Sequence, residues 1–333
     1  SVPNVFYLSN FSCNPMERLL GLIVFQEADP VMICPKLEEE QVKRAHWPFD
    51  IIGYTDNEDP WQLIQEQLAK KGIEQAQAYS IEEEVLTYAR SQRLHEMYPN
   101  AHMIPIDNQL KAMRLIQTPD EIKRMKEATR LADYAIEVGV SALKEGVSEL
   151  EVSAYITYRL RTEGIQGISS SPIVLFGEKS SLPHGVAGDR KLQKGDFVLF
   201  DLGVVVDGYY SDITRTFVYK EVTERQKEIY DAVLQSNLKA IEHCVVGTKI
   251  GKIDDLSREV IVEAGFGEYY PHRVGHGIGI EGHEHPSMNS HNEGLLQEGM
   301  TFTVEPGIYI PGFGGVRIED DVLVTKDGPE VLT

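Results

Sequence analysis

The sequence predicts an α+β protein with a smaller N-terminal α/β domain and a larger C-terminal domain. Its 333 residues are more than one compact core usually covers. Strand-like and helix-like segments alternate up to about residue 110, whereas strands predominate from residue 197 onward. The pattern changes just before TPDEIKRMKEATRLADYAIEVGVSALKEG, and we therefore expect domains of residues 1–114 and 115–333.

The composition is typical of a globular protein and excludes several other classes. Hydrophobic residues make up 42% of the chain and charged residues 25%. The sequence has no apolar run of about 18 residues, which argues against a membrane partner, and SVPNVFYLSN does not resemble a signal peptide. Three widely spaced cysteines indicate a reducing compartment, which we expect to be the cytoplasm. A net charge of -20 without a basic cluster argues against nucleic acid as a partner.

The N-terminal domain should alternate between strands and helices. NVFYL and GLIVFQ are rich in aromatic and β-branched residues, which favour strands, and DPVMICP is a short apolar run. DPWQLIQEQLAKKG predicts a helix with Asp59 as its N-cap and Pro60 at the first helical position. SIEEEVLTYARSQRLHEMYP predicts a second helix, with Ser80 and Glu83 as a capping box. We identify no catalytic group in this domain.

The C-terminal domain should contain four helices. Thr118 is an N-cap followed by Pro119, and apolar residues then recur at helical spacing. SELEVSAYITYRLRTEG predicts the next helix, and two more are expected at about residues 223–243 and 250–264.

Two aspartates lie in FVLFDLGVVVDGYYSDITRTFVY, which predicts a hairpin. Asp207 and Gly208 form a two-residue turn signal. With that turn, Asp201 and Asp212 become diagonal neighbours, roughly 7–8 Å apart at the backbone. Because Asp201 interrupts an apolar run, where an unpaired carboxylate is costly, a cation should lie between the two side chains.

Two glutamates interrupt two further apolar runs. Glu305 lies in TFTVEPGIYI and Glu319 in GVRIEDDVLVT, on either side of the turn-rich PGFG. Period-2 alternation places Arg317, Glu319 and Asp321 on one face, so Arg317 should look into the site that Glu319 serves. A structural Arg–Glu pair on a sheet surface is the competing interpretation.

HRVGHGIGIEGHEHP, residues 272–286, holds four of the ten histidines in a segment too rich in glycine for a good helix. His276, flanked by glycines, is the best ligand candidate among them. Four carboxylates would be balanced by two divalent cations, and two cations sharing one water lower the pKa of that water toward neutrality. One imidazole with four carboxylates suits manganese or cobalt and also accepts zinc or iron.

At these residues the sequence resembles the dinuclear peptidases of the pita-bread fold, which include methionine aminopeptidase, aminopeptidase P and prolidase, with creatinase as a relative. The resemblance covers about residues 118–333, and the first domain resembles the creatinase-type N-terminal domain. TVEPGIY, GVRIEDDV and SLPHG are similar to the proline-specific branch. The resemblance implies hydrolysis of the bond before proline, in small peptides with proline at the second position, by a homodimeric enzyme with two divalent ions, most simply Mn²⁺, with Co²⁺ or Zn²⁺ as alternatives.

The resemblance also implies roles for individual residues. Glu305 would act as proton shuttle, and His283 would stabilise the oxyanion. His184 would also be a catalytic residue, and His184 and Arg317 would contact the substrate or carry its carboxylate. His272 and His283 would contact the substrate as well. The metal ligands would be Asp201, Asp212, His276, Glu305 and Glu319, with Asp212 and Glu319 bridging the two ions.

Three other functions remain open at this level. Aminopeptidase P would use the same ligands on Xaa-Pro peptides of greater length. A non-catalytic binding protein on this fold should have lost some of the ligands, and all five are present. Creatinase-type hydrolysis without metal should not retain the full set either. An Xaa-Pro dipeptidase is therefore the leading hypothesis.

Overall fold

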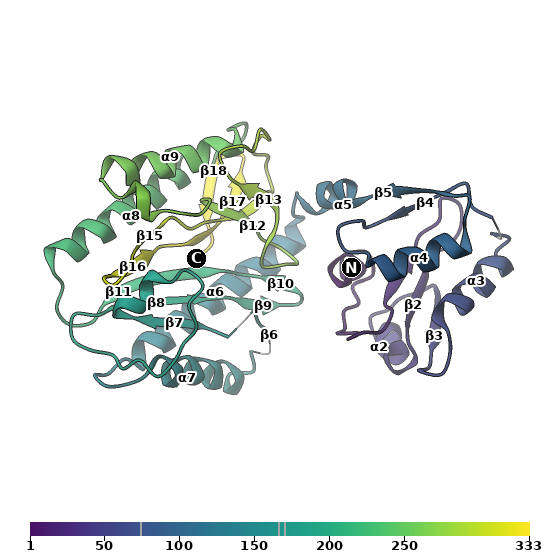
Figure 1. Cartoon of the computed structure of the whole chain (residues 1–333), viewed down its shortest axis with the longest axis horizontal. Helices are drawn as coiled ribbons and strands as arrows, with labels where there is room; N and C mark the ends of the chain where they lie inside the picture. Colours follow the sequence, from purple (N-terminus) through teal and green to yellow (C-terminus); the bar gives the residue numbers. More distant parts are fainter. Residues whose placement is uncertain (74, 166, 170) are drawn as a thin grey trace. The chain divides into compact units, whose positions relative to one another are not determined.

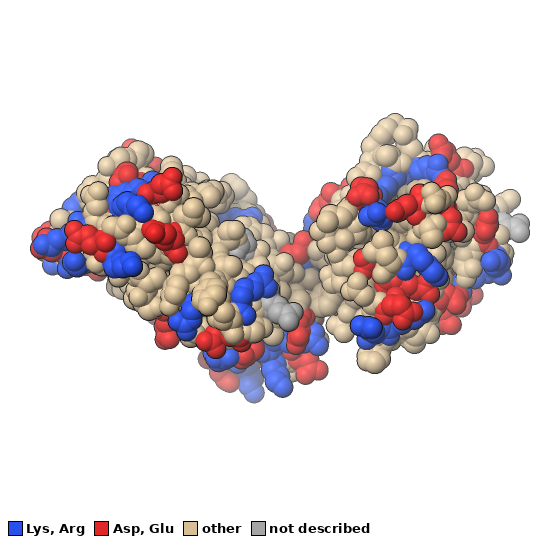
Figure 2. Space-filling view, turned by 90° about the horizontal axis from the view of Figure 1, so that it is seen from below, with Lys and Arg blue, Asp and Glu red and all other residues tan. Residues whose placement is uncertain are grey.

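The computed structural model describes residues 1–73, 75–165, 167–169 and 171–333 of the chain. It divides into two compact units, Ser1–Met113 and Arg114–Thr333, where the sequence predicted domains of residues 1–114 and 115–333 (Figure 1). No helix among the described residues is long and apolar enough to cross a membrane. On the face shown in Figure 2, acidic and basic side chains are interspersed over the surface.

The first unit is a small α/β structure built around one buried strand. Strand β2 is buried along its whole length and pairs antiparallel with β1 and parallel with β3. A second sheet consists of the parallel strands β4 and β5. The strands are β1 (Gly21–Ile23), β2 (Val31–Pro35), β3 (Asp50–Tyr54), β4 (Ala78–Ile81) and β5 (His102–Pro105). The helices are α1 (Val2–Ser9), α2 (Glu39–Arg44), α3 (Pro60–Lys70), α4 (Tyr88–Met97) and α5 (Asp107–Arg114).

Two predictions for this unit are wrong. The segment NVFYL is part of helix α1, because Ser1 caps its first turn and Pro3 lies at its start, where proline is well tolerated. Ser80 lies in β4 rather than at a helix N-cap, since β4 pairs with β5. Helix α4 begins only after Thr87, which is its N-cap. In contrast, α3 with its Asp59 cap is confirmed.

In its described residues, the second unit consists of antiparallel sheets covered by four helices. Helices α6 and α7 lie against β6 to β11, and α8 and α9 lie on the opposite side, against β12 to β18 (Figure 1). The four predicted helices are confirmed as α6 (Pro119–Ser141), α7 (Glu149–Thr162), α8 (Glu224–Glu242) and α9 (Ile250–Glu263). The first sheets contain β6 (Gly167–Ile168), β7 (Ile173–Phe176), β8 (Phe197–Leu202), β9 (Val204–Val206), β10 (Tyr209–Tyr210) and β11 (Ile213–Val218).

The C-terminal strands complete this unit. They are β12 (Gly275–Gly277), β13 (Glu284–Met288), β14 (Thr301–Val304), β15 (Gly307–Ile310), β16 (Gly314–Arg317), β17 (Asp320–Thr325) and β18 (Gly328–Val331). Five of them form one sheet in the order β13-β12-β14-β17-β18, and β15 pairs with β16. Apolar side chains from α6, α7 and β7 to β9 form one core cluster, and α8, α9 and the C-terminal strands form two more. The polar residues discussed below lie between these clusters.

Candidate metal centre

The predicted hairpin has the expected register. Val206 pairs with Tyr209 across the turn, and Asp207 and Gly208 both have positive φ, as a type I′ turn requires. Farther along the hairpin, Asp201 of β8 pairs with Thr214 of β11. Asp212 precedes Thr214 by two residues, so the two aspartates are diagonal neighbours on one face of the hairpin.

The two glutamates lie where strands are interrupted. Glu305 follows β14 and precedes Pro306, which cannot donate to a strand ladder. Glu319 lies between β16 and β17 and bridges to Thr214 of the hairpin. Its Oε2 accepts a hydrogen bond from the Thr214 hydroxyl at 2.6 Å. Because both glutamates lie outside regular strands, their side chains need not follow the alternation of strand faces. The bridge to Thr214 places Glu319 beside the two aspartates.

The predicted ligands form two overlapping clusters that share Glu319. In each cluster one ligand atom per residue lies within 4.8 Å of the others. A third group of Asp212, His276 and His283 satisfies the same criterion among the described residues. The two clusters that share Glu319 are His276, Glu305 and Glu319, and Asp201, Asp212 and Glu319.

His276 is oriented as a metal-ligating imidazole usually is. Its side chain is 2% exposed, and Nδ1 lies 3.1 Å from the carbonyl oxygen of Gly277. Because a carbonyl can only accept, Nδ1 carries a proton, and Nε2 is the ring nitrogen that faces the carboxylates and could bind a metal. Nε2 lies 3.2 Å from Glu305 Oε1. The backbone N–H of His276 donates to the Thr303 hydroxyl, which fixes the strand that carries the ring.

The carboxylates of this site repel one another. Burial raises the pKa of Asp212 and Glu319 well above the ordinary values, and each is raised further by the charges of neighbouring carboxylates. Burial also raises the pKa of Asp201, although Arg317 opposes the shift. For Glu305, burial acts upward, but the hydrogen bond and charge of His276 bring its pKa down to about 2.

This donor set fits divalent cations. Four buried or half-buried carboxylates lie close together, and Arg317 pairs with Asp201 among them, so the described side chains leave an excess of carboxylates over cations in the site. Oxygen ligands with one imidazole are a mostly hard set, as manganese or cobalt would require. The chemistry of the residues is therefore consistent with the predicted pair of ions.

Arg317 is engaged entirely within the protein. Its side chain is buried, Nη2 donates to Asp201 Oδ2, and Nε donates to the Thr214 hydroxyl at 3.1 Å. Nη1 donates to Tyr309 Oη at 3.0 Å. Arg317 looks into the site, as predicted, but its donors hold Asp201 and its neighbours. The geometry thus favours a supporting role over the predicted contact with the substrate's carboxylate.

The same correction applies to His272. Its Nδ1 lies 2.8 Å from the Arg273 carbonyl, so Nδ1 is the protonated nitrogen. Its Nε2 then accepts from Tyr309 Oη at 2.9 Å, and Tyr309 in turn accepts from Arg317. Burial lowers the pKa of His272, which agrees with a neutral ring. His272 is therefore linked to Arg317 through Tyr309, and this position favours a supporting role.

His283 and His184 both lie at the open side of the site. The His283 ring stacks on His276 with a centroid distance of 3.6 Å, and its other face is exposed. Partial desolvation and the neighbouring His276 lower the pKa of His283 to about 4, so this ring is neutral at pH 7. His184 is exposed and close enough for its charge to act on both Asp201 and His283.

Sequence reasoning missed three residues that shape the site. Thr214 and Tyr309 join Glu319 and Arg317 in one hydrogen-bond network. Arg273 donates from Nη1 to Ser287 Oγ at 2.7 Å, and Ser287 is the cross-strand partner of His276. Because cross-strand partners project from one face, the Arg273 guanidinium lies on the His276 side of the sheet. The sequence feature that could have identified Arg273 is its position next to His272 in HRVGHG.

Asp321 is the other departure from the predicted alternation. Its carboxylate is fully buried, and Oδ2 accepts from the backbone N–H of Asp212 at 2.9 Å. Its Oδ1 has no hydrogen-bond partner among the described residues. Since β16 ends at Arg317 and β17 begins at Asp320, the period of two does not continue through Glu319. Asp321 therefore supports the backbone of Asp212 instead of joining a ligand cluster.

Comparison with known proteins places this site in a class. Residues 123–326 match the model of metallopeptidase family M24, and residues 1–116 match the creatinase/prolidase N-terminal domain. The chain belongs to metallopeptidase family M24. The predicted architecture, a pita-bread catalytic domain preceded by a creatinase-like domain, is thereby confirmed, and the protein is a metallopeptidase.

Individual relatives cover almost the whole chain. A Bacillus subtilis (strain 168) protein named "Putative dipeptidase YkvY" is 52% identical over 99% of this chain and 91% of its own length. The solved Xaa-Pro dipeptidase from Bacillus anthracis is 37% identical, with a TM-score of 0.90 over 99% of this chain and 90% of that chain. The X-Pro aminopeptidase from Thermotoga maritima MSB8 is 31% identical, with a TM-score of 0.89 over 100% of this chain and 92% of that chain.

Proposed function

We propose that this protein is an Xaa-Pro dipeptidase that hydrolyses the bond preceding a carboxy-terminal proline. The observation that carries the proposal is the pair of ligand clusters that share Glu319, with the His283 ring stacked on His276 beside them. The names of the solved relatives support specificity for proline, and they include both a dipeptidase and an aminopeptidase.

The two clusters would hold two divalent ions, with manganese as the expected metal and cobalt or zinc as alternatives. Asp201 and Asp212 would serve one ion and His276 and Glu305 the other, with Asp212 and Glu319 as the ligands expected to be shared. Bound divalent ions supply two things to peptide hydrolysis, polarisation of the scissile carbonyl and a water of lowered pKa.

The side chains of the site transfer the proton and stabilise the negative charge that develops on the substrate. Glu305 accepts a proton and delivers it to the proline nitrogen as the peptide bond breaks. The neutral His283 ring donates an N–H to the carbonyl oxygen as negative charge develops there. His184 contacts the substrate from the opposite side of the opening.

A free cation supports the choice of dipeptides over longer peptides. Arg317 is committed to Asp201 and Tyr309, whereas the Arg273 guanidinium makes one hydrogen bond among the described residues, to Ser287. The remaining guanidinium donors of Arg273 could pair with a carboxylate that sits directly on proline. A substrate without that carboxylate would leave the cation unpaired, which costs roughly 1–3 kcal/mol.

The test compares three substrates at one metal concentration. We expect kcat/KM for a Xaa-Pro dipeptide to exceed that for the same dipeptide with an amidated end, and that for a tripeptide extended beyond proline, by roughly tenfold or more. Arg273→Gln should reduce this preference, whereas Arg225→Gln, an exposed arginine of α8, should not. Equal or faster cleavage of the tripeptide would reassign the protein to aminopeptidase P.

A further inference from the structure

A buried carboxylate bonds both ends of the segment that carries His184. Glu149, in the first turn of α7, is completely inaccessible to solvent. Its Oε1 accepts from the backbone N–H of Phe176 at 2.8 Å, where β7 ends. Its Oε2 accepts from the backbone N–H of Gly188 at 2.9 Å, beyond His184. One side chain therefore closes residues 177–188 into a loop.

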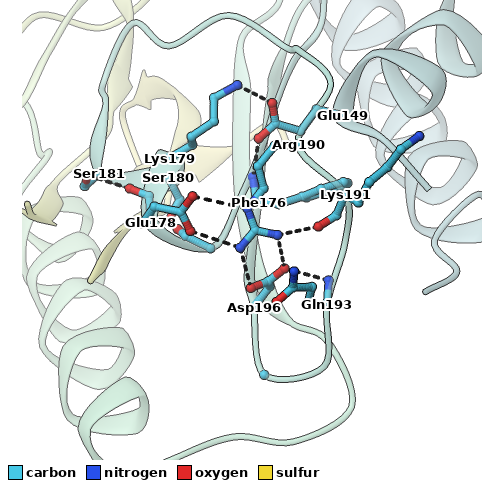
Figure 3. A network of polar contacts seen from close by, with 12 residues as sticks. Glu149, Phe176, Glu178, Lys179, Ser180, Ser181, Arg190, Lys191, Gln193 and Asp196 are labelled. Atoms are coloured by element: carbon cyan, nitrogen blue, oxygen red, sulfur yellow. Dashed lines mark hydrogen bonds and ion pairs between the residues drawn. The ribbon is translucent and has the colours of Figure 1, made fainter. Parts of the chain in front are cut away.

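Lys179 strengthens this closure from inside the loop. Its ammonium donates to Glu149 Oε2 (Figure 3). It also donates to the carbonyl oxygen of Val186 at 3.1 Å. A buried carboxylate is costly unless it is paired and hydrogen-bonded, and Lys179 supplies the opposite charge. The pair thus joins the near and far sides of the loop to α7.

A second ion network fixes the base of the same loop. Arg190 binds Asp196 through both terminal nitrogens, at 2.6 and 2.9 Å, and binds Glu178 Oε2 at 3.0 Å (Figure 3). Such bidentate pairs fix orientation as well as distance. The loop base is therefore rigidly held on two sides by groups that do not belong to the ligand clusters.

The tip of the loop lies at the metal centre. The carbonyl oxygen of Pro183 accepts from Arg317 Nη1 at 3.4 Å. The Ser180 hydroxyl accepts from the backbone N–H of Gly315 in β16 at 2.7 Å. His184 follows Pro183, and no hydrogen bond holds its ring among the described residues. The location of this ring consequently depends on the backbone that carries it.

We propose that Glu149 and Lys179 form a clamp that positions His184 at the active site, so that Glu149 is a positioning residue for the reaction. This inference rests on the proposed function, because that proposal assigns His184 to the substrate. Glu149 touches neither the substrate nor the ligand clusters. Its effect on turnover must therefore pass through His184, which makes the inference open to a double-mutant cycle.

The first experiment measures kcat/KM for a Xaa-Pro dipeptide with the metal-loaded protein and three variants. Glu149→Gln, which keeps size and shape, should lower kcat/KM roughly tenfold or more, since small displacements of a positioning group are costly. The double variant Glu149→Gln/His184→Ala should have a kcat/KM no lower than that of His184→Ala alone. Losses in kcat/KM that add in the double variant would overturn the clamp. Unchanged activity in a folded Glu149→Gln protein, or an unchanged kcat/KM in His184→Ala, would also overturn it.

Glu151→Gln is the matched control. Glu151 lies on the same helix, caps it with Ser148 and pairs with Lys191, and none of these bonds reaches residues 177–188. The same substitution there should leave kcat/KM within about twofold, as expected for an exposed pair. If Glu149→Gln does not fold, Lys179→Met removes the other half of the clamp and is expected to behave in the same way.

Hydrogen exchange separates the clamp from the proposed function. In Glu149→Gln or Lys179→Met, amides of residues 177–190 should exchange about tenfold faster than in the unmodified protein or in Glu151→Gln. Unchanged exchange would overturn the clamp. Failure of the unmodified protein to cleave any Xaa-Pro dipeptide would instead overturn the proposed function, and the exchange result would still decide whether the clamp exists.

Discussion

Glu305 combines two tasks in one carboxylate, because it lies within a ligand cluster and contacts His276. We predict that Glu305→Gln retains the fold but loses most turnover. An amide can still accept a hydrogen bond but cannot carry the proton, and such assistance is typically worth roughly 10²–10⁴-fold. Steady-state kcat with metal bound tests this, with circular dichroism as the control for folding. Wild-type kcat in this variant would exclude Glu305 as the proton shuttle.

Arg317 is expected to matter for stability as well as for activity. Arg317→Ala would leave the Asp201 carboxylate without its cation and remove one hydrogen bond from each of the hydroxyls of Thr214 and Tyr309. We predict a loss of about 3–5 kcal/mol in the free energy of unfolding of the metal-free protein, measured with urea. Arg130→Ala is the control, because Arg130 forms an exposed pair with Glu127 and should change stability by less than about 1 kcal/mol.

Single residues were predictable where their chemistry conflicts with their surroundings. Asp201, Glu305 and Glu319 interrupt apolar runs, and a charge in such a place needs a partner. Tyr309 gave no such signal, because tyrosine is an ordinary strand residue, and its hydroxyl contacts with His272 and Arg317 depend on the pairing of strands. Arg317 was correctly predicted to face the site. However, its guanidinium donors are used by Asp201 and Thr214, and these hydrogen bonds depend on a register between strands that the sequence alone does not give.

At the scale of elements, caps and turns were the reliable signals. Thr118 and Glu121 form the capping box that begins α6, and the Asp207–Gly208 turn sets the hairpin register. The prediction failed where tertiary contacts override local preference. Residues Glu83 and Glu84, expected in a helix, instead donate their backbone N–H groups to the buried Asp107. That aspartate makes a turn more favourable than a first helical turn at this point.

Helix α9 also supports the histidine segment. Asp254 is buried and accepts from the backbone N–H groups of Val274 at 2.8 Å and Ser290 at 3.0 Å. We predict that Asp254→Ala lowers the free energy of unfolding by about 1–3 kcal/mol, since both donors are left without a partner. Chemical denaturation measures the effect, and Asp255→Ala, on the exposed side of the same helix, should be nearly neutral. Equal losses in both variants would contradict the assigned contact.

At the scale of the whole molecule, metal should stabilise the fold as well as supply chemistry. We predict that chelation abolishes activity, and that manganese or cobalt restores it better than magnesium, which has little preference for imidazole. A ligand that binds the folded state at about 100 times its Kd adds about 2.7 kcal/mol of stability. Thermal unfolding should therefore show a higher Tm with manganese, and this shift should be lost in Asp212→Ala.

Metal content provides the independent measurement. Elemental analysis of the reconstituted protein should approach two ions per chain. Fewer than about one ion per chain under saturating manganese would contradict a dinuclear site. Full activity in the chelated, metal-free protein would contradict the proposed mechanism as a whole.

The bridge between Thr214 and Glu319 has a kinetic consequence. Their side chains bond across 105 residues of sequence, and Asp212 meets Asp321 across 109. Contacts of such long range form late, because the entropy of closing the intervening chain must first be overcome. No short segment of the nascent chain can therefore assemble a ligand cluster. Metal should be captured at the end of refolding, slowing the unfolding of the finished molecule without accelerating its formation.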